Sequence, residues 1–96
     1  MGASTERFEF GLIKFEVELK ASALEELKKL PRKDQLRISG VITILSVNPL
    51  PPASFKLTGR DGYQIRIGDY RLIYTVNASK LIVLVIKIGH REDVYR

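Results

Sequence analysis

The chain has 96 residues, of which 45% are hydrophobic, and these values fit one folded domain rather than a disordered segment. It has no cysteine and one histidine, which excludes a disulfide framework and a thiolate metal site and gives no support for a zinc site. Residues 27–96 carry thirteen basic and five acidic side chains, hence a charge of +8, within a total of +5. Such a basic body suggests a polyanionic partner, nucleic acid first, although the charge could also serve only to keep the domain soluble.

No apolar run approaches the roughly 18 residues that a membrane-spanning helix needs, so we expect no membrane association. The first residues lack the basic start and apolar centre of a secretory signal. We therefore expect a cytoplasmic protein. In it, residues 1–12 are an extension, natural or left over from cloning, and residues 13–96 form a single domain.

Residues 14–19 alternate apolar and charged side chains, which predicts a half-buried strand. A helix is expected to follow. Ser22 and Glu25 have the spacing of a capping box at its start, and the helix should end at Leu30, before Pro31.

A second helix is expected over about 33–47, because four apolar residues recur there with helical spacing: Ile38, Val41, Ile42 and Leu45. Gly40 lies inside this helix, where a glycine lowers stability by about 1 kcal/mol relative to alanine. We therefore expect a close packing contact at Gly40. The prolines of residues 48–52 should end the helix.

The rest of the chain has the pattern of strands. Residues 63–67 and 70–76 alternate, and the Gly68-Asp69 pair between them indicates a tight hairpin turn. Residues 81–88 are almost entirely apolar, which predicts a central strand covered on both faces. The order β-α-α-β-β-β predicts an α+β fold, with two N-terminal helices on one face of a mostly antiparallel, four-stranded sheet.

The second face of this sheet should carry polar groups. Neighbouring strands lie about 5 Å apart, so side chains from adjacent strands can converge. Several cations on one face repel one another and are more stable with an anion among them. The candidates are Gln64, Arg66 and Arg71 on the hairpin, and His90, Arg91 and Tyr95 at the end of the last strand.

Each candidate also has an ordinary structural explanation. Arg66 could be a solvated strand residue, and Arg71 could form an ion pair with Asp69 or Glu16. His90 could be a loop histidine without a role, and Tyr95 could anchor the terminus to the core. The joint pattern of three arginines, a histidine and a tyrosine is harder to explain by packing.

The sequence contains no carboxylate pair, glycine-rich phosphate loop or Ser/His/Asp arrangement that would define another active site. The remaining chemistry is phosphoryl transfer on RNA without a metal, in which the ribose 2′-OH is the nucleophile. Arginines can stabilise the pentacovalent phosphate, and a tyrosine or histidine can transfer protons.

Three segments carry a resemblance to a known family: LKKLPRKDQLRI, KLTGRDGYQIRIGDYRLIYTV and VIKIGHREDVYR. They resemble the RelE family of bacterial and archaeal toxins, within the RelE/ParE superfamily. The resemblance extends from about Lys14 to Arg96. The pairing of GDYR with the later GHR and VYR is its most specific part.

This resemblance implies the toxin of a type II toxin–antitoxin pair, with a microbial-RNase-like α+β fold and no cofactor. RelE-like members are ribosome-dependent endoribonucleases that cleave messenger RNA in the ribosomal A site and inhibit translation. The implied partners are a RelB-like antitoxin, mRNA, ribosomal RNA and, only through the antitoxin complex, operator DNA. The family's active groups fall here on Gln64, Arg66, Arg71, Arg91 and Tyr95.

One position departs from the family. RelE proper has a lysine where this chain has Gln64, which can bind phosphate but supplies neither charge nor a proton. The resemblance then places the general base at Tyr95, or at His90 as in some RelE-like toxins. Lys56 and Arg60 are possible substitute cations for RNA binding.

Two alternatives remain. One is a ParE-like inhibitor of DNA gyrase on the same fold, which would use Gly40 and the basic helix residues Lys28, Lys29, Arg32 and Lys33. The other is an inactive relative that only binds its antitoxin, an idea that rests on Gln64. In each case the first helix and the edge strand at residues 14–19 are candidate surfaces for the antitoxin.

Overall fold

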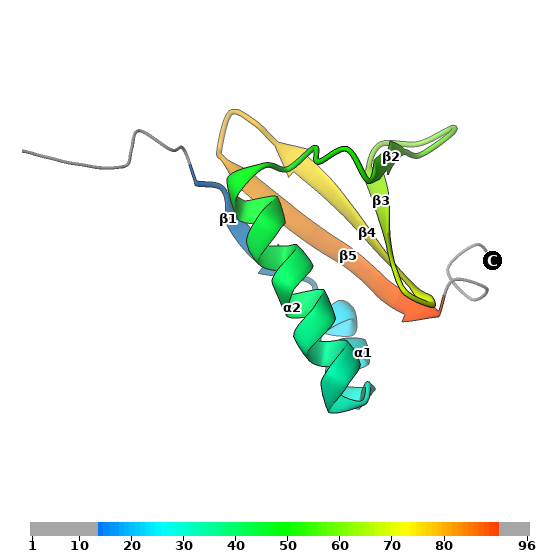
Figure 1. Cartoon of the computed structure of the whole chain (residues 1–96). Coiled ribbons are helices and arrows are strands. Elements are labelled where there is room, and N and C mark those ends of the chain that lie inside the picture. Colours follow the sequence, from blue (N-terminus) through cyan, green and yellow to red (C-terminus); the bar gives the residue numbers. More distant parts are fainter. Residues whose placement is uncertain (1–13, 91–96) are drawn as a thin grey trace, which may run out of the picture.

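The computed structural model describes residues 14–90, which form two helices and five strands (Figure 1). In chain order these are β1 Glu16–Leu19, α1 Ala21–Lys29, α2 Arg32–Val47, β2 Ser54–Lys56, β3 Tyr63–Ile67, β4 Tyr70–Asn77 and β5 Ile82–His90. The α+β class is confirmed, with the short strand β2 in addition to the four expected strands. The extension expected at residues 1–12 lies outside the described residues.

The five strands form one sheet in the order β1-β5-β4-β3-β2. All neighbours are antiparallel except β1 and β5, which are parallel, with Val17 opposite Val83. β5 is therefore an interior strand and β1 an edge strand, as the sequence predicts. The sequence also predicts that β5 is covered on both faces, and this prediction is wrong for the described residues. On the face away from the helices, the side chains of Ile82, Leu84 and Ile86 stay partly exposed.

Both helices pack against one face of the sheet and enclose the hydrophobic core with it (Figure 1). The predicted stripe of α2 is confirmed: Ile38 and Leu45 are fully buried, and Val41 and Ile42 pack partly buried against the core. The prediction of close packing at Gly40 is wrong. Its α-carbon is exposed, and an added Cβ would meet no atom within 4 Å.

The start of α1 also differs from the sequence-based expectation. The N-cap residue is Lys20, no side chain caps the helix, and Ser22 lies inside its first turn. The amide of Lys20 donates to the carbonyl of Val85 at 2.9 Å, and the carbonyl of Lys20 accepts from Leu24 at 2.9 Å. The strand pairing of β1 with β5 therefore sets where the helix begins, so no capping side chain is needed.

The β3–β4 hairpin has the predicted turn, with Gly68 in the left-handed conformation at φ 61°. The β4–β5 ladder has an irregularity that the sequence does not reveal. Ile73 pairs with Lys87 and Tyr74 pairs with Val85, so Ile86 is an extra residue on β5. This is the count of a β-bulge, a feature that re-aims side chains and increases local twist.

Within residues 14–90, neither helix is long and apolar enough to cross a lipid bilayer.

Candidate active site

The face of the sheet turned away from the helices carries the polar side chains of the β3–β4 hairpin. Arg66 on β3 lies directly opposite Arg71 on β4, close to the turn. Opposed residues of an antiparallel pair have Cβ atoms about 4.5–5.5 Å apart, and like charges at such positions destabilise the sheet. An anion bound at this pair would relieve the repulsion and form charge-assisted hydrogen bonds.

Arg71 is buried, with only 4% of its surface exposed, and is the one buried charged residue of the described chain. Its Nη1 donates a hydrogen bond to Oε1 of Gln64 at 2.7 Å. A buried charge is costly unless it is hydrogen-bonded. Gln64 therefore does two things: it helps to hold the Arg71 charge inside the protein, and it fixes the direction of one guanidinium nitrogen.

β5 adds a further cation to the same face. Gly89 pairs with Arg71 and Lys87 pairs with Ile73, so Lys87 projects on the side of the sheet that carries the arginines. Lys87 is exposed, as is Arg66. The open face thus carries a basic cluster of three cations within a few residue positions: buried Arg71 and exposed Arg66 and Lys87.

The loop between β2 and β3 brings Arg60 to this face. A hollow of about 180 Å³ lies beside the basic cluster, lined by Leu57, Arg60, Asp61, Ile73, Ile86 and Lys87. Arg60 is therefore near the cluster, since it lines the same hollow as Lys87.

Lys56 is not brought to the cluster. It pairs with Tyr63, and its Nζ lies 5.6 Å from the centre of the Tyr63 ring. That ring stacks on Tyr74 at 5.7 Å, on the helix side of the sheet. Phe55, which pairs with Gln64, occupies the open face instead and is 52% exposed.

His90 also lies away from the arginines. It pairs with Tyr70, and the two rings meet edge to face with centroids 6.0 Å apart. The hydroxyl of Tyr70 donates to Oδ2 of Asp34 on α2 at 3.3 Å, which places this group on the helix side. Desolvation and the negative charge of Asp34 raise the pKa of Tyr70 above its ordinary value.

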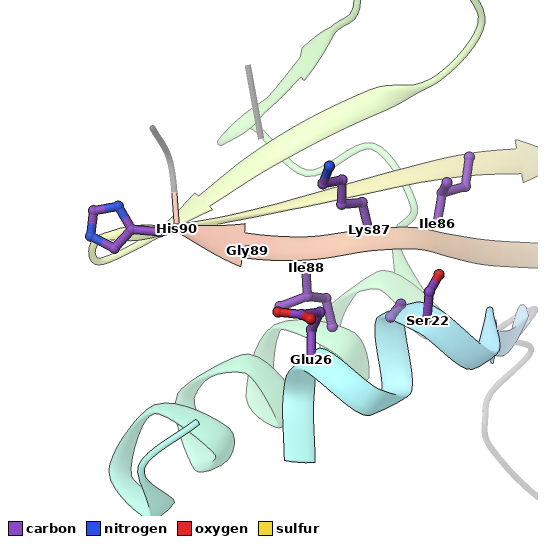
Figure 2. Close-up of a pocket in the computed structure, with 8 residues that line it drawn as sticks. Ser22, Glu26, Ile86, Lys87, Ile88, Gly89 and His90 are labelled. Atoms are coloured by element: carbon purple, nitrogen blue, oxygen red, sulfur yellow. The ribbon is translucent and has the colours of Figure 1, made fainter. Parts of the chain in front are cut away.

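A larger hollow of about 410 Å³ lies between α1 and the second half of β5 (Figure 2). It is lined by Ser22, Ala23, Glu26, Ile86, Lys87, Ile88, Gly89 and His90. It includes none of the hairpin residues Gln64, Arg66 and Arg71, although Ile86 and Lys87 line both hollows. The groups suited to phosphate chemistry are on the hairpin.

Arg91 and Tyr95 follow β5 but lie outside the described residues. Two residues of the open face were missed from the sequence, Phe55 and Lys87. Lys87 had a signal, because it is the one charged residue inside the apolar run of β5. Phe55 lies on a strand of three residues, too short to give a pattern.

The arrangement can bind a phosphate group and stabilise charge that develops on it. Among residues 14–90, no three His, Asp or Glu side chains are grouped so that they could hold a metal ion. Gln64 and the arginines act here as hydrogen-bond donors and acceptors and as fixed charges. None of them is a proton shuttle, because arginine stays protonated and an amide does not titrate.

Comparison with known proteins places this chain in a family. A model of the ParE toxin of type II toxin–antitoxin systems matches residues 17–95. A protein of Methanocaldococcus jannaschii assigned as toxin RelE1 is 35% identical over 88 residues, which cover 88% of this chain and 98% of that protein.

Solved structures of RelE toxins also match this chain. The archaeal RelE–RelB complex of Pyrococcus horikoshii matches with a TM-score of 0.71 and 28% identity, over 81% of this chain and 96% of the matched chain. The intact RelBE toxin–antitoxin complex of E. coli matches with a TM-score of 0.71 and 29% identity, over 79% and 95%. These matches define a toxin of a type II toxin–antitoxin system. The chain belongs to the RelE/ParE superfamily and is RelE-like.

Proposed function

We propose that this protein is a ribosome-dependent, metal-independent endoribonuclease that cleaves messenger RNA and thereby inhibits translation. The observation that carries the proposal is the hairpin cluster, in which buried Arg71 is held by Gln64 and lies opposite Arg66. Such a site suits a phosphodiester whose charge increases during the reaction.

In the proposed reaction the ribose 2′-oxygen loses its proton and attacks the adjacent phosphorus. The bond from phosphorus to the 5′-oxygen then breaks and this oxygen takes up a proton from water, giving a 2′,3′-cyclic phosphate and a 5′-hydroxyl end. Arg66 and Arg71 stabilise the pentacovalent phosphate, together with Arg91. Tyr95 is our candidate for the general base, since His90 is paired with Tyr70 on the helix side of the sheet.

The proposed partners are mRNA in the ribosomal A site, ribosomal RNA and a RelB-like antitoxin, in the cytoplasm. The complexes from Pyrococcus horikoshii and E. coli support the antitoxin as a partner, because both contain a RelE toxin with RelB. The edge strand β1 and helix α1, where Leu24 is 41% exposed, are the surfaces we propose for this contact.

A reconstituted reaction tests the enzymatic proposal. The purified chain is added to mRNA that is free, and to the same mRNA bound to ribosomes with an empty A site. We expect new mRNA ends only in the reaction with ribosomes. Both reactions contain a chelator and no divalent metal other than the Mg²⁺ that keeps the ribosomes intact. Intact mRNA in both reactions, with ribosomes known to be active, would refute the proposal.

Gyrase inhibition is the second candidate, favoured by the ParE name of the matching family model. The basic helix residues Lys28, Lys29, Arg32 and Lys33 are exposed, so they are accessible to a partner. Under that alternative the purified chain would block DNA supercoiling by gyrase and leave translation unaffected. An inactive relative would do neither, and would be harmless when expressed without an antitoxin.

A further inference from the structure

The floor of the 180 Å³ hollow beside the basic cluster is a buried apolar residue that does not belong to the hydrophobic core. Ile73 is 3% exposed, yet it lies on the open face and is absent from the core cluster on the helix side. Leu57 and Ile86 add apolar walls, and Arg60, Asp61 and Lys87 form a charged, exposed rim. An apolar floor with a few polar groups at its edge is the usual composition of a small-ligand site.

The β-bulge builds part of this hollow. Successive side chains of a regular strand point to opposite faces. Because Ile86 is the extra residue of the bulge, it and Lys87 both line the hollow. Figure 2 shows the two side chains on the side of β5 away from α1. Bulges are frequent next to active sites, where they re-aim a side chain.

The position of the hollow relates it to the phosphate site. Arg71 and Ile73 lie on the same face of β4, two residues apart, which corresponds to about 7 Å along a strand. A nucleotide whose phosphate is bound at Arg71 can reach the hollow with its base. The hollow has room for one planar ring system and is smaller than the roughly 300–1,000 Å³ of sites that enclose a drug-sized ligand.

We propose that this hollow binds a nucleobase of the RNA strand, next to the phosphate held by Arg71. The base packs on Ile73, Leu57 and Ile86. Its polar edge receives hydrogen bonds from Arg60 and Lys87 and donates to the carboxylate of Asp61. The assignment rests on the proposed function, since it takes RNA as the ligand of the hairpin cluster.

Binding to the isolated chain tests this site without a ribosome. The probe is a trinucleotide with 2′-O-methyl groups, which cannot be cleaved, compared with three versions that each lack one base. We expect the loss of one particular base to weaken binding about tenfold, and the other two losses to matter less. The amide NMR signals of Leu57, Asp61 and Ile73 should shift with the intact probe and not with that abasic version.

Two protein variants assign the effect to the hollow. Leu57→Trp fills it, and Lys87→Gln removes a positive charge from its rim. Both should reduce the discrimination between intact and abasic probes to about twofold or less. Lys80→Gln, an exposed lysine in the β4–β5 turn, removes the same charge elsewhere and should leave the discrimination unchanged.

Equal binding of intact and abasic probes, discrimination that persists in both hollow variants, or no binding at millimolar concentrations would each overturn the site. The outcome is separable from that of the proposed function. Ribosome-dependent cleavage without base discrimination removes the nucleobase site alone. Base discrimination without cleavage would refute the proposed enzymatic function and keep the assignment of the hollow as a nucleobase-binding site.

Discussion

Gln64 accepts a hydrogen bond from the guanidinium of Arg71, across the β3–β4 ladder, at 2.7 Å. The resemblance to RelE implies a lysine at the position of Gln64, which would place a third cation beside Arg66 and Arg71. The neutral side chain of Gln64 changes the electrostatic interactions of Arg71, because it accepts a hydrogen bond from the buried guanidinium, whereas a lysine would repel it. We interpret Gln64 as the residue that orients Arg71.

Two substitutions of Gln64 separate the effect of the hydrogen-bond acceptor from the effect of charge at this position. In Gln64→Ala the buried guanidinium loses an acceptor, so we expect a loss of about 1.5–3 kcal/mol in the free energy of unfolding and slower cleavage. In Gln64→Glu the acceptor remains and gains charge, so stability should be kept while cleavage falls, because the carboxylate repels phosphate. Denaturant unfolding and the cleavage rate on ribosomes check both. Unchanged stability and full activity of the alanine variant would contradict the role of Gln64 in holding Arg71.

Two glycines of the β2–β3 loop form a matched pair for a stability test. Gly62 has φ 122°, and a Cβ there would lie 3.1 Å from the carbonyl oxygen of Tyr74 and 3.2 Å from Leu57. Gly59 has φ 79° and no atom within 4 Å of that point. We expect Gly62→Ala to lower the unfolding free energy by about 2–3 kcal/mol and Gly59→Ala by about 1 kcal/mol. Equal effects in thermal or chemical unfolding would show that the contacts of Gly62 do not matter.

Gly40 offers a stabilising substitution. It lies in the interior of α2, exposed, with open space where a Cβ would be. Gly40→Ala should therefore raise the unfolding free energy by about 0.5–1 kcal/mol, through helix propensity. Toxicity should not change under the RNase proposal, whereas a gyrase inhibitor that uses this helix surface would be weakened. Growth assays at matched expression distinguish the two.

Tyr74 makes stability fall at high pH. Burial raises the pKa of its hydroxyl above the ordinary value, and the hydroxyl donates to the carbonyl of Pro49 at 2.7 Å. The unfolded chain releases this proton at about pH 10, before the folded chain does. The stabilisation is therefore complete below about pH 10 and is lost as pH rises through the folded pKa.

The variant Tyr74→Phe should have a lower unfolding free energy at neutral pH, because it lacks the hydrogen bond, and a flatter pH dependence above about pH 10. Tyr70 contributes to the same alkaline loss, so Tyr70→Phe should flatten the curve as well. Unfolding curves at several pH values check this. A variant curve as steep as that of the parent would exclude Tyr74 as a cause.

Much of the fold followed from periodicity. The bounds of α2, β3 and β4 agree with expectation to within a residue, because each segment has a regular apolar pattern and a clear turn or proline at its end. Leu81 was expected to start the last strand but ends the preceding turn, with φ 57°. Ser22 failed as a cap because a hydrogen bond between distant segments, Lys20 to Val85, sets the helix start.

The candidate site was predictable only in part, for related reasons. Alternation placed Gln64, Arg66 and Arg71 on one face, and the register confirms it. His90 required the register of β5 against β4, which the bulge shifts, and it proved to lie with Tyr70. Residue spacing cannot reveal a bulge, since an extra residue leaves no mark on composition. The hollow next to Arg71 was invisible for the same reason.

The most direct test of the central claim is to map mRNA ends in cells during induced expression. The parent chain is compared with Arg71→Ala, and with Arg32→Ala as a control that removes an exposed arginine from α2. We expect growth arrest with new, codon-phased ends in the parent and the control, and a loss of these ends by about 100-fold or more in Arg71→Ala. Circular dichroism must show that the Arg71 variant is folded. Growth arrest without new mRNA ends, or unchanged ends in a folded Arg71→Ala, would contradict the account.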